Sequence, residues 1–519
     1  MKKIYKKLMA VLAVSAITTS AFIGCSSSET ESNATTDGSI QIGIKADISS
    51  LDPHGQNDTV SGYAVRHIYD TLVDVTYDNK FVPKLAESWT VSEDGTVYNF
   101  KLKENVKFHD GSILTSEDVK FSLERQKESA RVGHLISMIK DIEVVDDLNF
   151  KIILDTPSNS LISSLSHMGC SILNKNYVEK LEAEGKKLAD APMGTGPYKF
   201  ESWTPGSSFS LVKNSDYYDV ANIAKNDRLE FKIIPEDTSR TIALENNEID
   251  LMIGVPTIDA QRIQDNSDLE LDLFDQTRME YFIMNHDKEP FDDQLVREAM
   301  NYAINKDDVL TVMYDGKGET IDSYFTPVTI GYQEVESPYT YDLEKAKELL
   351  KEAGFEDGFT FNCYVSSSER EKGATVIQAN LKDIGVTMNI EMMESSTFFD
   401  KTGNGDHDAC MTGWSANADP DNTFRPLFSS STVGDGGNRA FYRNTAVDAL
   451  IDVAATNPDP AAVVEAQKNM FEIFTQDALW VPLVNPDGMI ARQANLEGLG
   501  LSSIGMERFE GLHFVETAE

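Results

Sequence analysis

The sequence has few cysteines and lacks the short motifs that mark several enzyme and metal-binding classes. It contains four cysteines among 519 residues, and no two of them form a CxxC pair. Zinc-ribbon and thioredoxin-like sites are therefore excluded. The HExxH, GxSxG and GxxxxGK[ST] patterns and the EF-hand loop are also missing, which argues against a metalloprotease, an α/β-hydrolase, a P-loop enzyme and a calcium sensor. We expect no catalytic residues and a protein that is not an enzyme.

Positive charge is also scarce. Lys and Arg number 46 against 85 Asp and Glu, which gives a formal net charge of −39. Such a surface repels phosphate backbones and anionic headgroups, so nucleic acid is excluded as a partner. We interpret the charge as a solubility feature; the alternative is a preference for cationic ligands. None of the eight histidines lies four residues from another, and the sequence predicts neither a metal site nor a cofactor.

Long apolar runs are confined to the N-terminus. Residues 1–24 have a basic start and a long apolar run, which is typical of an export signal rather than a spanning helix. The segment Phe22–Cys25 resembles a lipobox, which implies cleavage before Cys25 and its modification with diacylglyceryl and fatty acyl chains such as palmitate. Residues 25–38 form a polar, flexible tether. We expect a lipid-anchored protein on the outer face of the cytoplasmic membrane, at the cell surface or in the periplasm.

Residues 81–125 carry the clearest local pattern in the chain. An Asp94-Gly95 turn separates two stretches in which apolar and polar residues alternate, which predicts a β-hairpin with one buried face. Thr115 and Asp118 then have capping-box spacing before an apolar helical pattern, although Asp replaces the usual Glu or Gln.

The same stretch resembles the signature of the family 5 extracellular solute-binding proteins, the dipeptide, oligopeptide and nickel receptors of ABC importers. The matching pieces are PKLAESW at 83–89, SEDGT at 92–96 and KFHDG at 107–111, with LDP at 51–53, MGTGPY at 193–198 and PFDD at 290–293. The resemblance implies an α/β protein with the two-lobed type II periplasmic-binding-protein fold and an inserted subdomain. It also implies a monomer that captures a small solute, foremost a peptide, between its lobes and delivers it to an ABC permease with a separate ATPase.

Local patterns and the resemblance together divide the chain. Residues 360–392 alternate strand, helix and strand, which indicates an α/β lobe. We expect the chain to cross between lobes near Met284–Lys288 and Val484–Pro486. The expected parts are 1–24 signal peptide, 25–38 tether, 39–66, 192–281 and 485–519 lobe I, 67–191 inserted subdomain, and 282–484 lobe II. Gly194 and Gly196 are interpreted as structural, because no GxGxxG or GK[ST] motif accompanies them.

The resemblance places the ligand beside Trp414. Peptide-binding relatives carry an Asp three residues after this Trp, and that Asp holds the α-ammonium of the peptide through a charge-assisted hydrogen bond. Here Asn417 occupies the position, and an amide lacks the charge that offsets desolvation of a cation. Asp419 or Asp421 supplies the charge if the loop is displaced. The alternative role of both is loop capping next to Pro420.

Three further groups are candidate ligand contacts. They are Asn57, Asp58 and Thr59 in a polar loop, Arg278, Glu280 and Tyr281 before the expected crossing, and Arg439 in a glycine-rich segment. The structural alternative is turn capping for the first group, strand-edge pairing for the second, and a lobe-closing salt bridge for the third. An arginine among glycines can present a planar fork to a carboxylate.

Several alternatives stay open at this point. Cys363 and Cys410 lie on predicted strands of one lobe and can either pair or remain buried thiols together with Cys170. The solute can be a metal chelate or an oligosaccharide instead of a peptide, and a receptor that senses peptide without importing it has the same sequence features. A secreted hydrolase would need a nucleophile and a base brought together by the fold.

Overall fold

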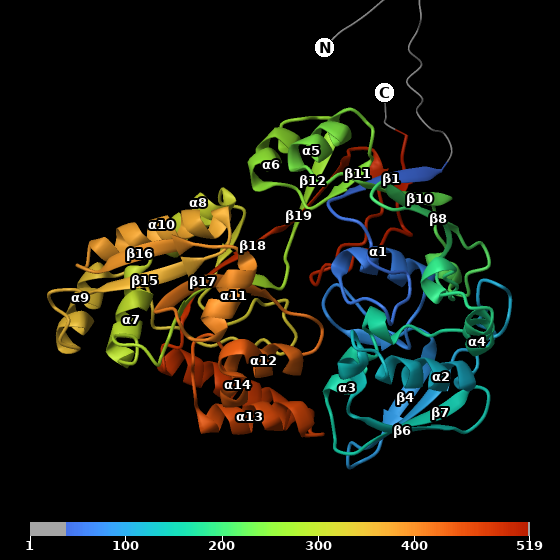
Figure 1. Ribbon diagram of the computed structural model, residues 1–519, viewed down its shortest axis with the longest axis horizontal. Helices are drawn as coiled ribbons and strands as arrows, with labels where there is room; N and C mark the ends of the chain where they lie inside the picture. The colour runs from blue at the N-terminus through green and yellow to red at the C-terminus, as the bar shows by residue number, and fades with distance from the viewer. Residues whose placement is uncertain (1–37, 517–519) are drawn as a thin grey trace, which may run out of the picture. The chain divides into compact units, whose positions relative to one another are not determined.

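The computed structural model describes residues 38–516. The predicted signal peptide, Cys25 and all of the tether except Gly38 lie outside the described residues. The core of the first lobe is a seven-stranded mixed sheet in the order β12–β19–β11–β1–β10–β9–β8 (Figure 1). Its elements are β1 Ser39–Ile44, α1 Thr59–Ile68, β8 Tyr198–Thr204, β9 Ser208–Lys213, the 3-10 helix η4 Val220–Asn222, β10 Arg228–Ile233, α5 Asp237–Glu245, β11 Leu251–Ile253, α6 Thr257–Gln264, β12 Leu269–Phe274 and β19 Gly488–Gln493. A small ribbon of β20 Leu496–Glu497 and β21 His513–Phe514 follows near the C-terminus.

The inserted subdomain has its own four-stranded antiparallel sheet, in the order β4–β5–β7–β6. Its elements are β2 Val73–Val75, β3 Phe81–Pro83, β4 Ala86–Val91, β5 Val97–Leu102, α2 Ser116–Lys127, η1 Gly133–Ile136, β6 Ile139–Val144, β7 Asn149–Leu154, α3 Ser160–Ser164, η2 Met168–Cys170, α4 Lys175–Ala183 and η3 Leu188–Asp190. The predicted hairpin is confirmed as β4 and β5. The predicted helix start is confirmed too, because the Thr115 amide donates to the Asp118 carboxylate at 2.9 Å.

The second lobe is built on a six-stranded sheet in the order β14–β18–β13–β17–β15–β16. Its elements are β13 Arg278–Met284, α7 Gln294–Ala303, α8 Lys306–Tyr314, β14 Gly318–Thr320, α9 Leu343–Glu352, β15 Thr360–Val365, α10 Ser368–Lys382, β16 Thr387–Met392, α11 Ser395–Gly403, β17 Ala409–Ser415, α12 Asp421–Phe428, η5 Ser430–Thr432, η6 Gly434–Gly436, α13 Thr445–Thr456, α14 Pro460–Gln476 and β18 Val481–Pro486. The predicted strand–helix–strand unit is confirmed, since β15 and β16 are parallel and α10 connects them.

Sheet pairing shifts the two crossings between lobes. β13 pairs with β17 along its whole length and belongs to the second-lobe sheet, so the chain crosses between Phe274 and Arg278 rather than near Met284–Lys288. The return crossing lies between Pro486 and Gly488, because β18 and β19 belong to different sheets. The apolar run of β13 is buried on both faces, and such a run gives no alternation from which a boundary can be read.

The two glycines of the MGTGPY segment lie against the end of α1. A Cβ atom on Gly194 would stand 2.3 Å from the carbonyl oxygen of Ile68, and one on Gly196 would stand 2.5 Å from that of His67. Only glycine permits this close approach of two backbones. The close contact gives the motif a packing role where the chain returns to the first lobe.

The thiols of Cys363 and Cys410 point to opposite faces of the second-lobe sheet. Cys363 lies beside Ala409 and Cys410 beside Tyr364, so the two cysteines differ by one residue in register and their side chains alternate. They belong to separate hydrophobic clusters. Both are free, buried thiols, as is Cys170; the pairing that the sequence left open does not form.

None of the helices between residues 38 and 516 is both long and apolar enough to span a membrane.

Candidate ligand-binding site

One cavity brings together segments that are far apart in the sequence. Its volume is about 230 Å³, and it is lined by the start of α1, by residues 163–168 of the inserted subdomain, by the loop after β17 and by residues 504–506. Five of the predicted ligand contacts line it: Asn57, Asp58, Thr59, Asn417 and Asp419. The other five, Arg278, Glu280, Tyr281, Trp414 and Arg439, do not line this cavity.

Asp419 is the central charged group of the loop after β17. Its Oδ1 accepts hydrogen bonds from Ser160 Oγ at 2.8 Å and from the Asp421 amide at 3.0 Å, and its Oδ2 accepts from Asn422 Nδ2 at 3.0 Å. The side chain is 6% exposed, and burial raises its pKa to about 6. No cationic side chain among residues 38–516 forms an ion pair with it. A carboxylate in this environment favours a cation that it can bind directly.

The neighbouring polar residues have other partners. Asn417 is exposed, and its Oδ1 accepts from the Asp419 amide at 2.8 Å, which is a local turn bond. The Asp421 carboxylate pairs with Arg425 at 3.0 Å, one helical turn further along α12. Of the two acidic residues that the sequence offered, Asp419 is therefore the one that lines the cavity without a cation. Thr277 fixes the start of the loop, since its Oγ1 donates to the Ala416 carbonyl at 2.6 Å.

Asp58 begins α1 as its N-cap. Its Oδ1 accepts from the Ser61 amide at 2.8 Å, and its Oδ2 accepts from the hydroxyls of Ser49 and Ser61 at 2.5 and 2.9 Å. These three bonds satisfy the carboxylate, so the capping role accounts for this residue. Asn57 and Thr59 are exposed on either side of it and remain predicted ligand contacts.

Glu280 lies inside the second lobe in an ion cluster. The side chain is completely buried and pairs with Arg370 at 2.8 Å and with Arg278 at 2.7 Å. Burial by itself would raise the pKa of Glu280, but the two arginines lower it. Tyr281 points the other way along the strand and stacks on Trp480, with ring centroids 4.8 Å apart. Pairing at a strand edge was the structural alternative for these residues. β13 is instead a central strand of its sheet, because it has neighbours on both sides.

Trp414 and Arg439 pack within the second lobe. Trp414 is half-buried on β17, opposite Met279, and its indole N–H is buried without an acceptor in the described chain. The Arg439 guanidinium stacks over the Phe399 ring at 5.1 Å. The lobe-closing salt bridge considered for Arg439 is not formed among residues 38–516, and contact of Arg439 with a carboxylate of the ligand stays a prediction.

Comparison with known proteins assigns the family. The family model described as bacterial extracellular solute-binding proteins, family 5 Middle, matches residues 80–435. The chain belongs to the family 5 extracellular solute-binding proteins. The glutathione-binding protein GsiB of Shigella flexneri is 31% identical over 471 residues, which cover 88% of this chain and 91% of that protein. GsiB of Escherichia coli K12 is equally similar, at 31% identity over the same length.

Solved structures of similar proteins agree with the family. The periplasmic binding protein DppA of Helicobacter pylori, in complex with the peptide STSA, is 33% identical with a TM-score of 0.74 and covers 92% of this chain and 98% of its own. HbpA2 of Haemophilus parasuis is 29% identical with a TM-score of 0.84 and covers 92% of this chain and 100% of its own. The predicted type II periplasmic-binding-protein fold is confirmed.

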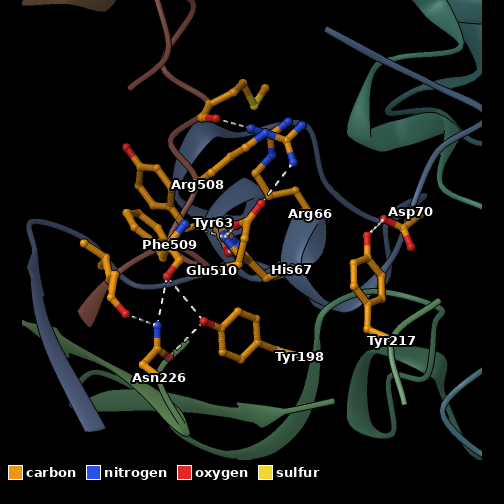
Figure 2. A network of polar contacts seen from close by, with 12 residues as sticks. Tyr63, Arg66, His67, Asp70, Tyr198, Tyr217, Asn226, Arg508, Phe509 and Glu510 are labelled. Carbon is orange, nitrogen blue, oxygen red and sulfur yellow. Dashed lines mark hydrogen bonds and ion pairs between the residues drawn. The ribbon is translucent and has the colours of Figure 1, made fainter. Parts of the chain in front are cut away.

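Sequence reasoning missed the polar residues that this family 5 protein contributes from α1 and the inserted subdomain. Arg66, Ser164 and His167 line the same cavity as Asp419. Figure 2 shows Arg66 on α1 beside the segment that carries Arg508 and Glu510, and its Nη1 donates to the Met506 carbonyl. No motif marks these residues, because they come together only in the folded chain; the Arg66 contact with Met506, for example, spans 440 positions of sequence.

Proposed function

We propose that this chain is the receptor of an ABC importer for a small peptide or peptide-like solute, held in the cavity with its free amine at Asp419. It delivers the solute to a permease driven by a separate ATPase. A lipid on Cys25 holds the monomeric receptor at the outer face of the membrane. The observation that carries the proposal is the buried Asp419 carboxylate, which lines the cavity and has no cationic partner. An ammonium group bound there gains a charge-assisted hydrogen bond and supplies the missing charge.

The relatives support the chemistry of this proposal. GsiB is named for binding glutathione, and DppA of Helicobacter pylori holds a peptide; both ligands are peptides. A cavity of about 230 Å³ lies below the range of about 300–1,000 Å³ that is typical of ligand pockets, which favours a short peptide. Closure of the lobes around it requires that the peptide bind the closed state more tightly than the open one.

Calorimetry with free and blocked amines tests the proposal. The probes are glutathione and Ala-Ala-Ala, each compared with its N-acetylated form. The parent protein should bind the free-amine probes more tightly, and Asp419→Asn should lose about 1.5–3 kcal/mol of that affinity, the range for a hydrogen bond to a charged group. Asp421→Asn is the matched control, because its carboxylate pairs with Arg425 and should leave the preference intact. Equal affinity of the parent for free and acetylated probes, or binding of neither, would contradict the proposal.

A further inference from the structure

The last turn of α13 leaves two backbone carbonyls without a donor from their own lobe. In a continuing helix, the carbonyls of Ala454 and Ala455 would accept from the amides of residues 458 and 459. Residue 458 is a proline and has no N–H group, and the Asp459 amide donates instead to Oδ1 of Asn457 at 2.9 Å. The two carbonyls therefore need a donor from another part of the chain or from water.

Asn159 of the inserted subdomain supplies these donors. Its backbone amide donates to the Ala455 carbonyl at 2.8 Å. Its side-chain Nδ2 donates to the carbonyls of Ala454 at 2.8 Å and Asn457 at 2.9 Å. We call this set of three bonds the Asn159 latch. The end of α13 is thus capped by the opposite side of the cleft, and this cap exists only while the inserted subdomain and the second lobe are in contact.

The segment before α3 is held in place by its own subdomain. The Tyr98 hydroxyl on β5 donates to the Ser158 carbonyl at 3.1 Å. The hairpin turn at Gly95 lies close to prolines of both parts of the chain, since a Cβ atom on Gly95 would stand 3.1 Å from Cβ of Pro157 and 3.4 Å from Cβ of Pro458. The hydrogen bonds to α13 are therefore accompanied by an apolar contact between the inserted subdomain and the second lobe.

The latch lies next to the proposed amine site without belonging to it. Asn159 is outside the set of residues that line the cavity, whereas the next residue, Ser160, donates to Asp419 at 2.8 Å. We propose that Asn159 is a positioning residue that fastens the inserted subdomain to the end of α13 on closure and thereby brings Ser160 to the Asp419 carboxylate. The inference rests on the proposed function, because its consequence is slower release of the peptide. A contact made only in the closed state stabilises that state and whatever it encloses.

Two substitutions at Asn159 separate hydrogen bonding from shape. Asn159→Ala removes the side-chain donor, and the nearly isosteric Asn159→Asp replaces it with an acceptor that repels the same carbonyls. Calorimetry with Ala-Ala-Ala should show about three- to tenfold weaker binding by Asn159→Ala, the scale of one or two partly exposed hydrogen bonds, and a larger loss for Asn159→Asp. Stopped-flow measurements should place most of the loss in the dissociation rate, because the latch forms after the encounter. A side chain that acted through its shape would tolerate Asn159→Asp.

The fraction of closed molecules is a second readout. Dyes attached at Val145→Cys and Lys351→Cys, which are exposed residues of the inserted subdomain and of the second lobe, report closure by single-molecule energy transfer. Both Asn159 variants should show a smaller closed fraction than the parent, with Ala-Ala-Ala and without it. A residue that only supports the local fold would not shift this equilibrium.

Asn99→Ala is the matched control. Asn99 is an exposed residue of β5, and its side chain forms no hydrogen bond to the second lobe within residues 38–516, so affinity, release and closure should remain those of the parent. Parent-like dissociation and closure in Asn159→Asp, with the loss on N-acetylation intact, would overturn the latch and leave the proposed function standing. Equal binding of free and acetylated probes by the parent would refute the proposed function. The ligand-free closed fractions would then decide the latch, and equal fractions in parent and variants would overturn it.

Discussion

Ser160 of the inserted subdomain donates a hydrogen bond from its Oγ to Oδ1 of Asp419 at 2.8 Å, across 259 positions of sequence. Ser160 begins α3, and Asp419 lies in the loop that leads from β17 into α12. A bond to the charged form of a carboxylate lowers its pKa, whereas burial raises it; in Asp419 burial is the larger effect. The carboxylate is therefore oriented by the inserted subdomain but not neutralised by it.

Binding of a free-amine probe should depend on pH through Asp419. Burial places the pKa of this carboxyl at about 6 in the ligand-free protein, and an ammonium requires the charged form. Below pH 6 the affinity for Ala-Ala-Ala should fall by up to about tenfold per pH unit, and it should fall again toward pH 8, where the α-amino group of the probe, with a pKa of about 7.7–8.0, loses its proton. The groups around Asp419 are the Ser160 hydroxyl, the Asn422 amide, the Asp421 backbone N–H and the Asp421 carboxylate, whose negative charge adds to the effect of burial on the pKa of Asp419.

Calorimetry from pH 5 to pH 8 on the parent and on Asp419→Asn measures this dependence. The variant should show a flat profile between pH 5 and 6. The same slope in both proteins would assign the titration to another group.

Asp419→Asn should stabilise the ligand-free protein at neutral pH. The folded-state pKa of about 6 lies above the ordinary value of 3.8, so the folded chain binds a proton more tightly than the unfolded chain. The stability that this proton contributes is present below pH 3.8 and is lost as pH rises through 6. At pH 7 the buried charge costs about 3 kcal/mol. We expect Asp419→Asn to recover only about 1–2 kcal/mol of this cost, because the amide loses the charge-assisted hydrogen bonds that the carboxylate accepts.

Denaturant unfolding at pH 7 and at pH 4.5 checks this prediction. The advantage of the variant should shrink at the lower pH, where the parent is protonated. Asp421→Asn is the control and should lose about 0.3–0.5 kcal/mol, the range for an i,i+4 helix pair such as Asp421 and Arg425. A variant that is less stable than the parent at pH 7 would contradict the prediction.

Arg370→Met should destabilise the second lobe. It leaves Glu280 buried with Arg278 as its remaining ionic partner, and breaking a buried pair costs about 3–5 kcal/mol. The double change Arg370→Met with Glu280→Gln should recover part of this loss, because it removes the buried charge. Unfolding in urea measures both. Since Glu280 does not line the cavity, Glu280→Gln should bind Ala-Ala-Ala within about threefold of the parent; a larger loss would show that Glu280 contacts the peptide.

Cys25→Ala should abolish the lipid anchor. The expectation rests on the lipobox-like segment Phe22–Cys25 and the polar tether that follows it. Two acyl chains hold a protein on a membrane far more firmly than one, because each buried methylene contributes about 0.8 kcal/mol. The variant should appear in the soluble fraction or remain unprocessed, as seen by detergent partition and intact-protein mass spectrometry. A processed variant that still partitions into detergent would rule out this anchor.

Local chemistry made much of the fold readable from the sequence. The hairpin around Asp94-Gly95, the helix start at Thr115 and the strand–helix–strand unit over 360–392 depend on neighbours within a few residues. The structure bears all three out. The lobe crossings were misplaced, because β13 is buried along nearly its whole length and an uninterrupted apolar run does not reveal which sheet it joins.

The sequence by itself determined the family, the α/β class and the position of the loop after Trp414, since each is written in contiguous residues. Only the tertiary structure decided which carboxylate of that loop lacks a cation, because Asp421 finds Arg425 one helical turn away while Asp419 meets Ser160 of another subdomain. It also decided that Arg66 and His167 share a cavity with Asp419. Charge balance and desolvation depend on the neighbours that a side chain has in space, and those neighbours come from segments hundreds of residues apart.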